Sequence, residues 1–482
     1  MKRSIIFAAA VLLTACSTAP FMRPHTDLPA AWRSPAATGT ALADRPWGEL
    51  FQAAEIQTLI RSALEQNADL RIAAERVELA RAQYGIQRSN LYPNVLGDAA
   101  YTRSRQPSIA SATENRTGET ASIGLAMPVW EIDLWGRLRA QNEAAWRSVL
   151  ASEENRRFLY VSLIAQVVLA YLDLMEADAQ LEIARRTAQT RRESLRLVRL
   201  RFDNGIVSAV DLQQAESLLA GAEVTIADLQ RRQVQGENFL SVLIGRNPGP
   251  IARALKLSDY ALPPELPAGM PAQLIERRQD VRAAEQTLAA SQANVDAAKK
   301  AYLPAISLTG FLGVISPELE DLFDSGRDAW SVSPALTAPI FTAGRLASNV
   351  EFAEAQQRIA AEQYRQAIRN ALREVEDALV AYQRLREQRD ALERVVAADR
   401  ERLRLTRMRY EGGVSSYFEV LDSERQYFSS ELSLVQTTRA AYASVVQLYR
   451  ALGGGWSPDA ENAALDSGAL WSGRTRGTGI DA

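Results

Sequence analysis

Two stretches of this chain, 208 positions apart, are diverged copies of one another. The first copy, RFDNGIVSAVDLQQAE, covers residues 201–216, and the second, RYEGGVSSYFEVLDSE, covers residues 409–424. Each copy places a glycine turn between two helical patterns. A period of about 200 residues is too long for one unit of a solenoid. The sequence therefore predicts one domain made of two similar halves, residues 53–245 and 272–456, joined by a proline-rich connector over residues 246–271.

The N-terminus has the layout of a secretory signal peptide. Lys2 and Arg3 precede an apolar run over residues 5–13, which is too short to span a bilayer, and small residues then lead to Cys16. LTAC at residues 13–16 resembles the bacterial lipobox, in which cleavage precedes an acylated cysteine, and Ser17 resembles the signal that sorts lipoproteins to the outer membrane. We therefore expect residues 1–15 to be removed and Cys16 to carry lipid. The alternative is a chance cysteine in an uncleaved segment.

Charge and hydropathy narrow the class of protein further. Without residues 1–15 the chain has 53 basic and 58 acidic residues, a net charge of −5, because only Lys2 and Arg3 are removed from the 55 basic residues of the full sequence. This balance does not indicate a nucleic-acid partner. We identify no later apolar run as long as a transmembrane helix, so a membrane span is expected to consist of strands. Residues 16–52 are expected to be extended, and residues 457–482 to form a tail.

Two proline-free stretches, residues 136–203 and 344–411, are dense in Ala, Leu, Arg, Glu and Gln and predict unusually long helices. A helix of this length would extend for about 100 Å. In the second stretch one narrow apolar stripe recurs at spacings of three and four, at Tyr364, Ile368, Leu372, Val375, Leu379, Tyr382 and Leu385. Such a stripe must pack laterally, as a coiled coil or a wall. Return helices are expected over residues 209–243 and 417–452, and shorter helices over residues 53–90 and 271–301 could extend them.

Between the shorter and the longer helix of each half, the apolar period changes to two. Ile123, Leu125 and Met127 alternate with small or polar residues, and the alternation recurs over residues 306–312 and 330–336, whereas residues 95–104 match it less well. The pattern predicts two β-hairpins, at about residues 94–131 and 305–341. Strands of about ten residues with one apolar and one polar face are typical of outer-membrane barrels. The alternative is a soluble sheet with one face on a helix layer.

Four strands cannot close a barrel, and unpaired strand edges are not tolerated in lipid. Two chains would supply eight strands, whose interior is filled by side chains, whereas three chains would supply twelve strands and leave an aqueous lumen. A membrane role therefore predicts a homotrimer. We expect four prolines to mark the junctions between strands and helices, because a fixed φ and a missing N–H suit the change of structure. These are Pro93, Pro128, Pro304 and Pro339.

Catalysis is not expected of this chain. His25 is the only histidine, so a Ser/His/Asp triad or a histidine-based metal site would have to be built around it. The sequence has no GxxxxGK(S/T) loop for nucleotide hydrolysis. We therefore predict no catalytic residue, no metal site and no cofactor other than the lipid on Cys16. The energy for any transport is expected to come from a partner.

Together these features resemble the outer-membrane efflux proteins of the TolC/OprM type, in their lipoprotein branch. The resemblance rests on the duplicated order of helix, proline, hairpin, proline and helix, on the DNG and EGG turns, on VLDSE at residues 420–424 and on ALGGGW at residues 451–456. It implies an α+β membrane protein in which a trimeric twelve-stranded barrel continues into a long periplasmic α-helical barrel. It also implies two partners, a periplasmic adaptor and an inner-membrane RND-type pump, and passive export of drugs and other toxic small molecules.

The resemblance also implies roles for residues at the helical turns. It places a periplasmic gate at Phe418, Glu419 and Asp422, where six carboxylates from three chains would raise some of their own pKa values and attract cations. It implies a gate latch between Asp211 and Tyr410, although the basic residue of some members is replaced by Ser415 and Ser416. The adaptor would dock on the tips of the turns, at Gly205, Ile206, Val207, Gly413, Val414 and Ser415. The alternatives are first-turn acids that favour the helix dipole, helix packing for Phe418, and simple turn chemistry at the tips.

Two other functions stay open from the sequence. A type I protein-secretion duct would share the pore, although lipidation and the ALGGGW ending resemble the efflux branch more. A structural or adhesive coiled-coil lipoprotein would share the long helices, but a rod does not need four alternating strands bracketed by prolines.

Overall fold

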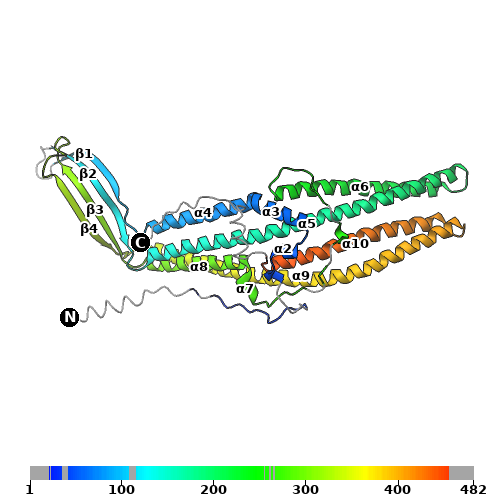
Figure 1. The fold of residues 1–482 in the computed structure, drawn as a ribbon. Helices are drawn as coiled ribbons and strands as arrows, with labels where there is room; N and C mark the ends of the chain where they lie inside the picture. The colour runs from blue at the N-terminus through cyan, green and yellow to red at the C-terminus, as the bar shows by residue number, and fades with distance from the viewer. Residues whose placement is uncertain are drawn as a thin grey trace. The chain divides into compact units, whose positions relative to one another are not determined.

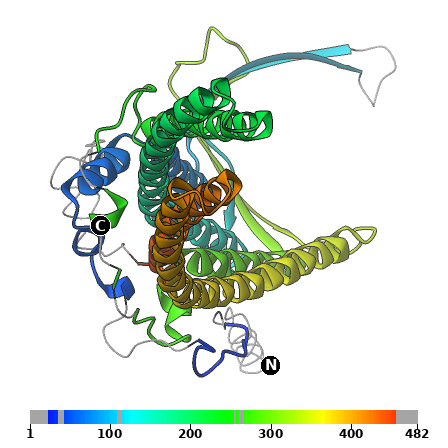
Figure 2. The ribbon, with the colours of Figure 1, turned by 90° about the vertical axis from the view of Figure 1, so that its right-hand side faces the viewer.

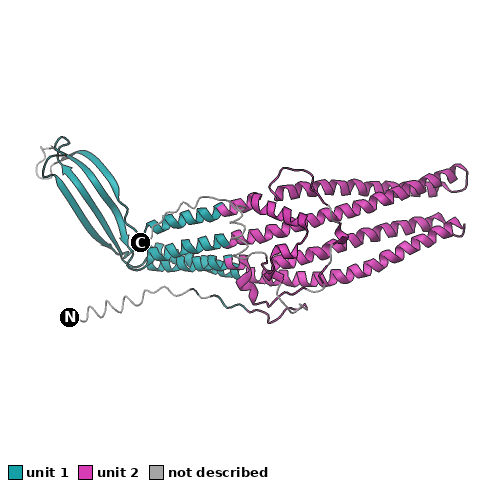
Figure 3. Cartoon of the chain, in the orientation of Figure 1, with its two compact units in different colours: residues 1–26, 75–153, 283–365 teal, residues 27–74, 154–282, 366–482 magenta. Residues whose placement is uncertain are grey.

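The computed structural model describes residues 21, 23–34, 42–107, 115–253, 256–259, 262–263 and 266–454. The chain divides into two compact units, shown in Figure 3. Unit 1 comprises residues 1–26, 75–153 and 283–365, and unit 2 comprises residues 27–74, 154–282 and 366–482. The predicted signal peptide, the lipidation site Cys16 and the C-terminal tail lie outside the described residues.

Four long helices confirm the duplicated helical pattern. Helices α5 (Arg137–Asp203) and α9 (Arg345–Glu411) have 67 residues each, and the return helices α6 (Ala209–Leu243) and α10 (Tyr417–Ala451) have 35 residues each. In Figures 1 and 2, α6 runs beside α5 and α10 runs beside α9. The lengths are equal because the two copies keep a constant offset of 208 positions through both helices and through the glycine turn between them.

The shorter helices are interrupted where one continuous helix was expected. The first is divided into α3 (Ala54–Gln66) and α4 (Ala68–Ser89), with Asn67 in an extended conformation. The second is divided into α7 (Gln273–Arg277) and α8 (Gln279–Lys300), with Arg278 extended. The expectation of unbroken helices over residues 53–90 and 271–301 is therefore wrong at two equivalent positions.

At both interruptions the extended residue contacts the C-terminal end of a return helix. The side-chain amide of Asn67 donates to the carbonyl of Leu243 at 3.0 Å, and the guanidinium of Arg278 donates to the carbonyl of Ala451 at 3.1 Å. Asn67 also caps α4, because its Oδ1 accepts a hydrogen bond from the backbone N–H of Leu70. The shorter helices thus extend the return helices end to end, as the sequence suggested, and the extended residue satisfies the carbonyls at the joint.

Glycines after α6 and α10 allow the ends of these helices to approach the backbone of the shorter helices closely. Gly245 has φ +71°, and a Cβ there would lie 2.5 Å from the backbone oxygen of Gln66. The equivalent Gly453 has φ +72°, and its Cβ would lie 3.2 Å from the backbone oxygen of Arg277. Only glycine combines the left-handed backbone with this close approach.

In unit 1 the strands form one antiparallel sheet in the order β1-β2-β3-β4. The strands are β1 (Leu96–Pro107), β2 (Asn115–Ile132), β3 (Ala305–Ser316) and β4 (Asp328–Thr337). Both predicted hairpins are confirmed, and pairing of β2 with β3 joins the two halves of the duplication. At this central pair Gly124 lies opposite Gly313, and a Cβ on either would come within 2.5 Å of the opposing backbone.

The register places apolar and polar side chains on opposite faces of the sheet. Leu125 lies opposite Leu312, which in turn lies opposite Trp330. The opposite face carries mainly hydroxyl and other polar groups, at Asp98, Thr102, Ser122, Ser307, Thr309, Ser331 and Ser333. The large apolar side chains are exposed, since Leu125 is 52%, Leu312 63% and Trp330 76% accessible in the single chain.

Pro128 does not mark a junction between strand and helix. It lies inside β2, at a register shift between Met127 and Trp130, where β2 has one residue more than β3. The bulge changes the parity of the apolar positions, so that Trp130 and Ile132 stay opposite Leu308 and Ile306. The other three prolines lie between a strand and a helix as predicted.

Among the described residues, one helical segment has the length and hydropathy of a membrane-spanning helix. Helix α5 includes an 18-residue stretch that is long and apolar enough to cross a membrane, which corrects the expectation that no such run exists. Because 72% of this stretch is buried inside the protein, it fits the core of a helical unit, which passes the same test. In α9 the predicted stripe is confirmed, with Tyr364, Ile368 and Val375 almost fully buried.

The N-terminal segment is only partly extended. Residues 23–29 have no regular structure, but a 3₁₀ turn covers Leu42–Asp44 and the short helix α2 covers Trp47–Leu50. The indole of Trp32 donates to the carbonyl of Gly269 at 2.8 Å, and the carboxylate of Glu376 accepts from the backbone N–H groups of Arg33 and Ser34. These bonds attach the segment to the connector and to α9 within unit 2.

Candidate functional site

The two helical turns of unit 2 share one backbone geometry. After α5, the N–H of Ile206 donates to the carbonyl of Arg201 at 2.8 Å; after α9, the N–H of Val414 donates to the carbonyl of Arg409 at 2.9 Å. Gly205 and Gly413 take φ +70° and +72°. This is the Schellman ending, and it explains why each copy of the repeated sequence needs its glycine.

The predicted docking residues divide into an exposed and a half-buried group. Ile206 is 71% and Val414 68% accessible, and Gly205 and Gly413 are exposed with open space around their Cα atoms. Val207 and Ser415 are half-buried. Val207 packs against the cluster of buried apolar side chains behind the tips, which is described below. Two large apolar side chains therefore project from the tips without cover in the single chain.

The two return helices begin differently. At α6, the hydroxyl of Ser208 accepts from the N–H of Asp211 and the Asp211 carboxylate accepts from the N–H of Ser208, which forms a reciprocal capping box. At α10, Ser416 makes no side-chain cap within the described chain. The carboxylate of Glu419, equivalent to Asp211, instead lies 3.9 Å from the guanidinium of Arg409.

The latch residues have partners other than each other. The hydrogen bonds of Asp211 go to Ser208, whereas the Tyr410 hydroxyl accepts from the Arg201 guanidinium at 2.7 Å. The Arg201 guanidinium carbon also lies 5.2 Å from the centre of the Tyr410 ring, within the range of a cation–π contact. The contact between α5 and α9 is thus made by Arg201, which the functional reading of the sequence missed. Its signal was the arginine shared by both copies of the repeat.

The predicted gate residues lie together on the first turns of α10, and the charge of Asp422 is compensated within the chain. Phe418 is 59% exposed. The carboxylate of Asp422 accepts from Arg402 of α9 at 2.7 Å and from Arg425 at 2.8 Å. The hydrogen bond from Arg402 is the main reason that the pKa of Asp422 lies below its usual value in the single chain.

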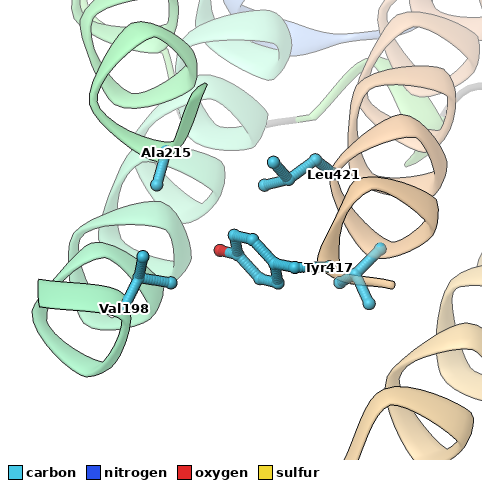
Figure 4. Close-up of a cluster of buried hydrophobic side chains, with 5 residues drawn as sticks. Val198, Ala215, Tyr417 and Leu421 are labelled. Carbon is cyan, nitrogen blue, oxygen red and sulfur yellow. The ribbon is translucent and has the colours of Figure 1, made fainter. Parts of the chain in front are cut away.

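An apolar cluster supports the tips from behind. It consists of Val198, Ala215, Tyr417, Val420 and Leu421, contributed by α5, α6 and α10. In Figure 4 the Tyr417 ring extends from α10 toward Val198 and Ala215, with its hydroxyl leading. Burial raises the pKa of Tyr417 far above that of free tyrosine. The first turn of α10, which carries the predicted gate, is therefore held by packing against the first-repeat helices.

Charged groups are also buried beside this cluster. The carboxylate of Glu424, only 6% exposed, accepts from Arg407 of α9 at 2.6 Å. Arg191, 5% exposed, donates to the carbonyl of Leu218 at 2.7 Å, and burial lowers its pKa. Buried charges are retained only where hydrogen bonds compensate their desolvation. A glutamate is the last residue of both copies of the repeat, Glu216 and Glu424, so the duplication marks this position, although nothing in the sequence indicated the burial of Glu424.

Comparison with known proteins identifies the family. The family described as "Outer membrane efflux protein" matches residues 59–246 and 270–454, one segment in each half. The chain is 36% identical over 471 residues to the "Probable efflux pump outer membrane protein TtgC" of Pseudomonas putida, covering 95% of this chain and 96% of that protein. It is 37% identical over 454 residues to the outer membrane protein OprJ of Pseudomonas aeruginosa, covering 93% and 94%. The open state of the MtrE outer membrane channel of Neisseria gonorrhoeae superposes with a TM-score of 0.82 at 33% identity, covering 92% of this chain and 99% of that one. This chain belongs to the outer membrane efflux protein family.

Proposed function

We propose that three copies of this chain form the outer-membrane channel of a tripartite efflux pump in a Gram-negative bacterium. The observation that carries the proposal is the sheet, which has one exposed apolar face, one hydroxyl-rich face and two strands, β1 and β4, that pair on one side only among the described residues. Unpaired strand edges are too costly in lipid, so the sheet requires neighbours. Three copies give twelve strands with apolar side chains toward lipid and polar ones toward a water-filled lumen.

In this assembly the helices form a periplasmic duct that carries small molecules passively. The names of several relatives refer to efflux pumps, one of them for an antibiotic and one for toluene, which favours drugs and other toxic compounds as cargo over a secreted protein. A coiled-coil rod would not require the two-faced sheet. Lipid on Cys16, after removal of residues 1–15, would anchor the chain to the outer membrane.

The partners follow from the two ends of such a duct. A periplasmic adaptor would dock on the exposed tips around Gly205, Ile206, Gly413 and Val414 and connect the channel to an inner-membrane RND-type pump. The bare apolar side chains of Ile206 and Val414 suit a helical partner, because small turn residues beside them allow close backbone approach.

The constriction of the channel would lie at Phe418, Glu419 and Asp422. Because Arg402 and Arg425 already neutralise Asp422, Phe418 and Glu419 are the groups that remain to narrow and charge the lumen. Docking of the adaptor would widen this point by separating the tips, against the bond between Arg201 and Tyr410.

Single-channel recording in planar bilayers tests the proposal. Replacing Phe418, Glu419 and Asp422 with Ala is expected to raise the conductance, whereas Val210→Ala with Gln214→Ala, at the equivalent positions of the first repeat, should leave it unchanged. Unchanged conductance in the triple variant would remove these residues from the gate. A folded, detergent-extracted protein with the mass of one chain and no conductance would refute the channel itself.

A further inference from the structure

A cavity of about 250 Å³ lies behind the helix tips, between α5, α9 and α10 of unit 2. We name it the tip cavity. Its wall includes Leu197, Val198, Tyr410, Tyr417, Val420 and Glu424. Ligand pockets for drug-sized molecules have volumes of about 300–1,000 Å³, so this cavity suits a smaller guest.

Two polar groups of the wall are buried without a hydrogen bond. Tyr417 and Glu424 are 7% and 6% exposed, and neither the Tyr417 hydroxyl nor the Oε2 atom of Glu424 has a hydrogen-bond partner among the described residues. Ser194, which also lines the cavity, interacts with Tyr417 without reaching hydrogen-bond geometry. Glu424 uses only Oε1, which binds Arg407. Buried polar groups are almost always paired, so the carboxylate oxygen and the hydroxyl, which belong to the wall of one cavity, are both available for hydrogen bonds to a ligand.

The charge of the wall favours a cationic donor. Three acidic side chains, Glu193, Glu411 and Glu424, outnumber the two basic ones, Arg201 and Arg407. Arg407 is bound to Glu424, and Arg201 to the Tyr410 hydroxyl. Arg191 also interacts with Glu424, but it is not part of the wall and donates to Leu218. Glu193 and Glu411 are exposed, so Glu424 is the buried acidic group of the wall, and its Oε2 atom is the one that a cationic donor can reach.

Two aromatic rings complete the site. Tyr410 and Tyr417 lie with ring centres 5.1 Å apart at an angle of 44°. Aromatic faces attract organic cations, and Arg201 already makes this contact with the ring of Tyr410. A carboxylate with a free oxygen, a free phenol hydroxyl and two rings is a combination suited to an alkylammonium or guanidinium group.

We propose that the tip cavity binds a small organic cation carrying a primary ammonium or guanidinium group. Its N–H groups donate to Oε2 of Glu424 and to the Tyr417 hydroxyl, and its alkyl part contacts Leu197, Val198 and Val420. The terminal torsion of a glutamate is soft, so a small rotation turns Oε2 toward the cavity. Such a ligand bridges the first-repeat helix α5 and the second-repeat helices α9 and α10, at the level of the tips.

Ligand-observed NMR on the full-length protein in detergent tests this site. The probes are n-butylammonium and its neutral isostere n-butanol, and the readout is saturable saturation transfer to the ligand. Glu424→Gln removes the negative charge but keeps an oxygen for Arg407, and it is expected to weaken n-butylammonium binding about ten- to hundredfold, the effect of one charge-assisted hydrogen bond. Glu216→Gln alters the equivalent carboxylate of the first repeat, which is partly exposed and outside the wall, and should leave binding unchanged.

Further variants keep the test decisive if Glu424→Gln does not fold. Leu197→Trp is placed at an exposed wall residue, so folding should be retained while the added ring blocks the cavity and abolishes binding. Tyr417→Phe should weaken it about two- to tenfold. No saturable binding to the wild type, equal binding of n-butanol, or full binding in Leu197→Trp would each overturn the proposal. Because these experiments measure binding and not conductance, their failure would leave the channel function untouched.

Discussion

Replacement of Arg278 by Ala is expected to weaken the joint between α10 and α8, because this side chain connects both helices. The guanidinium is 3% exposed and donates to four oxygens: both carboxylate oxygens of Asp280, at 2.9 and 2.6 Å, Oε2 of Glu374 at 2.9 Å and the Ala451 carbonyl at 3.1 Å. Its removal leaves two carboxylates and the last carbonyl of a 35-residue helix without this donor.

The size of the effect follows from the exposure of the partners. Removing one member of a fully buried ion pair costs about 3–5 kcal/mol. The Asp280 and Glu374 side chains keep 26% and 30% of their accessible surface, so water partly replaces the lost donor. We therefore expect Arg278→Ala to lower the free energy of unfolding by about 2–4 kcal/mol.

Chemical unfolding in detergent, followed by circular dichroism, measures this difference. Arg277→Ala is the matched control, because Arg277 is adjacent and pairs with Asp44 at 2.6 Å but is 34% exposed; it should cost no more than about 1 kcal/mol. Asn67→Ala, at the equivalent joint of the first repeat, should cost about 1–2 kcal/mol through the lost cap of α4. Equal losses in Arg277→Ala and Arg278→Ala would refute the argument from burial.

Three further outcomes are expected. Ser208→Ala should lower the free energy of unfolding by about 0.5–2 kcal/mol because it removes a capping box, whereas Ser416→Ala should change it by less than about 0.5 kcal/mol; thermal unfolding of both variants tests this. Gly245→Ala should destabilise the protein more than Gly205→Ala. Both glycines have positive φ, which costs about 1–2 kcal/mol with alanine, but only the Cβ at position 245 would collide with backbone atoms. Comparison of the denaturant midpoints of the two variants tests this difference. Arg402 lowers the pKa of Asp422 in the folded state. The stabilisation of the folded protein by this pair is therefore present above the unfolded pKa of about 3.9 and is lost as pH falls through the folded pKa. The difference in unfolding free energy between wild type and Arg402→Ala should be constant near neutral pH and vanish in acid, and a difference that grows on acidification would contradict this expectation.

The long helices and their turns were predictable because their causes are local. Absence of proline, strong helix formers and a glycine at the end of each stretch indicate α5 and α9 without reference to the rest of the fold. The interruptions at Asn67 and Arg278 have a different cause. Neither residue breaks a helix by its own propensity, and each becomes extended where the end of a return helix meets the shorter helix. A contact between residues 176 positions apart is not visible in a local pattern.

The sheet shows the same limit on a smaller scale. Alternation of apolar residues correctly indicated the strands, but it ended at Met127 and made Pro128 look like the end of β2. The strand continues because a one-residue bulge restores the apolar face at Trp130. A change of parity, from odd to even apolar positions around a proline, is the sequence signal of such a bulge. Pairing of β2 with β3, which unites the halves, depends on glycines that allow close backbone approach.

At the tips, the divergence between the two copies explains why motif comparison placed the residues correctly but not their contacts. Asp211 and Glu419 occupy the same position of the repeat, yet only Asp211 caps its helix. The longer Glu419 side chain lies near Arg409 instead, and Ser416 makes no side-chain cap bond within the described residues. In the first repeat the acidic residue therefore stabilises its own helix as part of the cap. The second repeat leaves a half-exposed carboxylate beside the exposed ring of Phe418. The second turn therefore keeps an acidic side chain that does not cap its own helix.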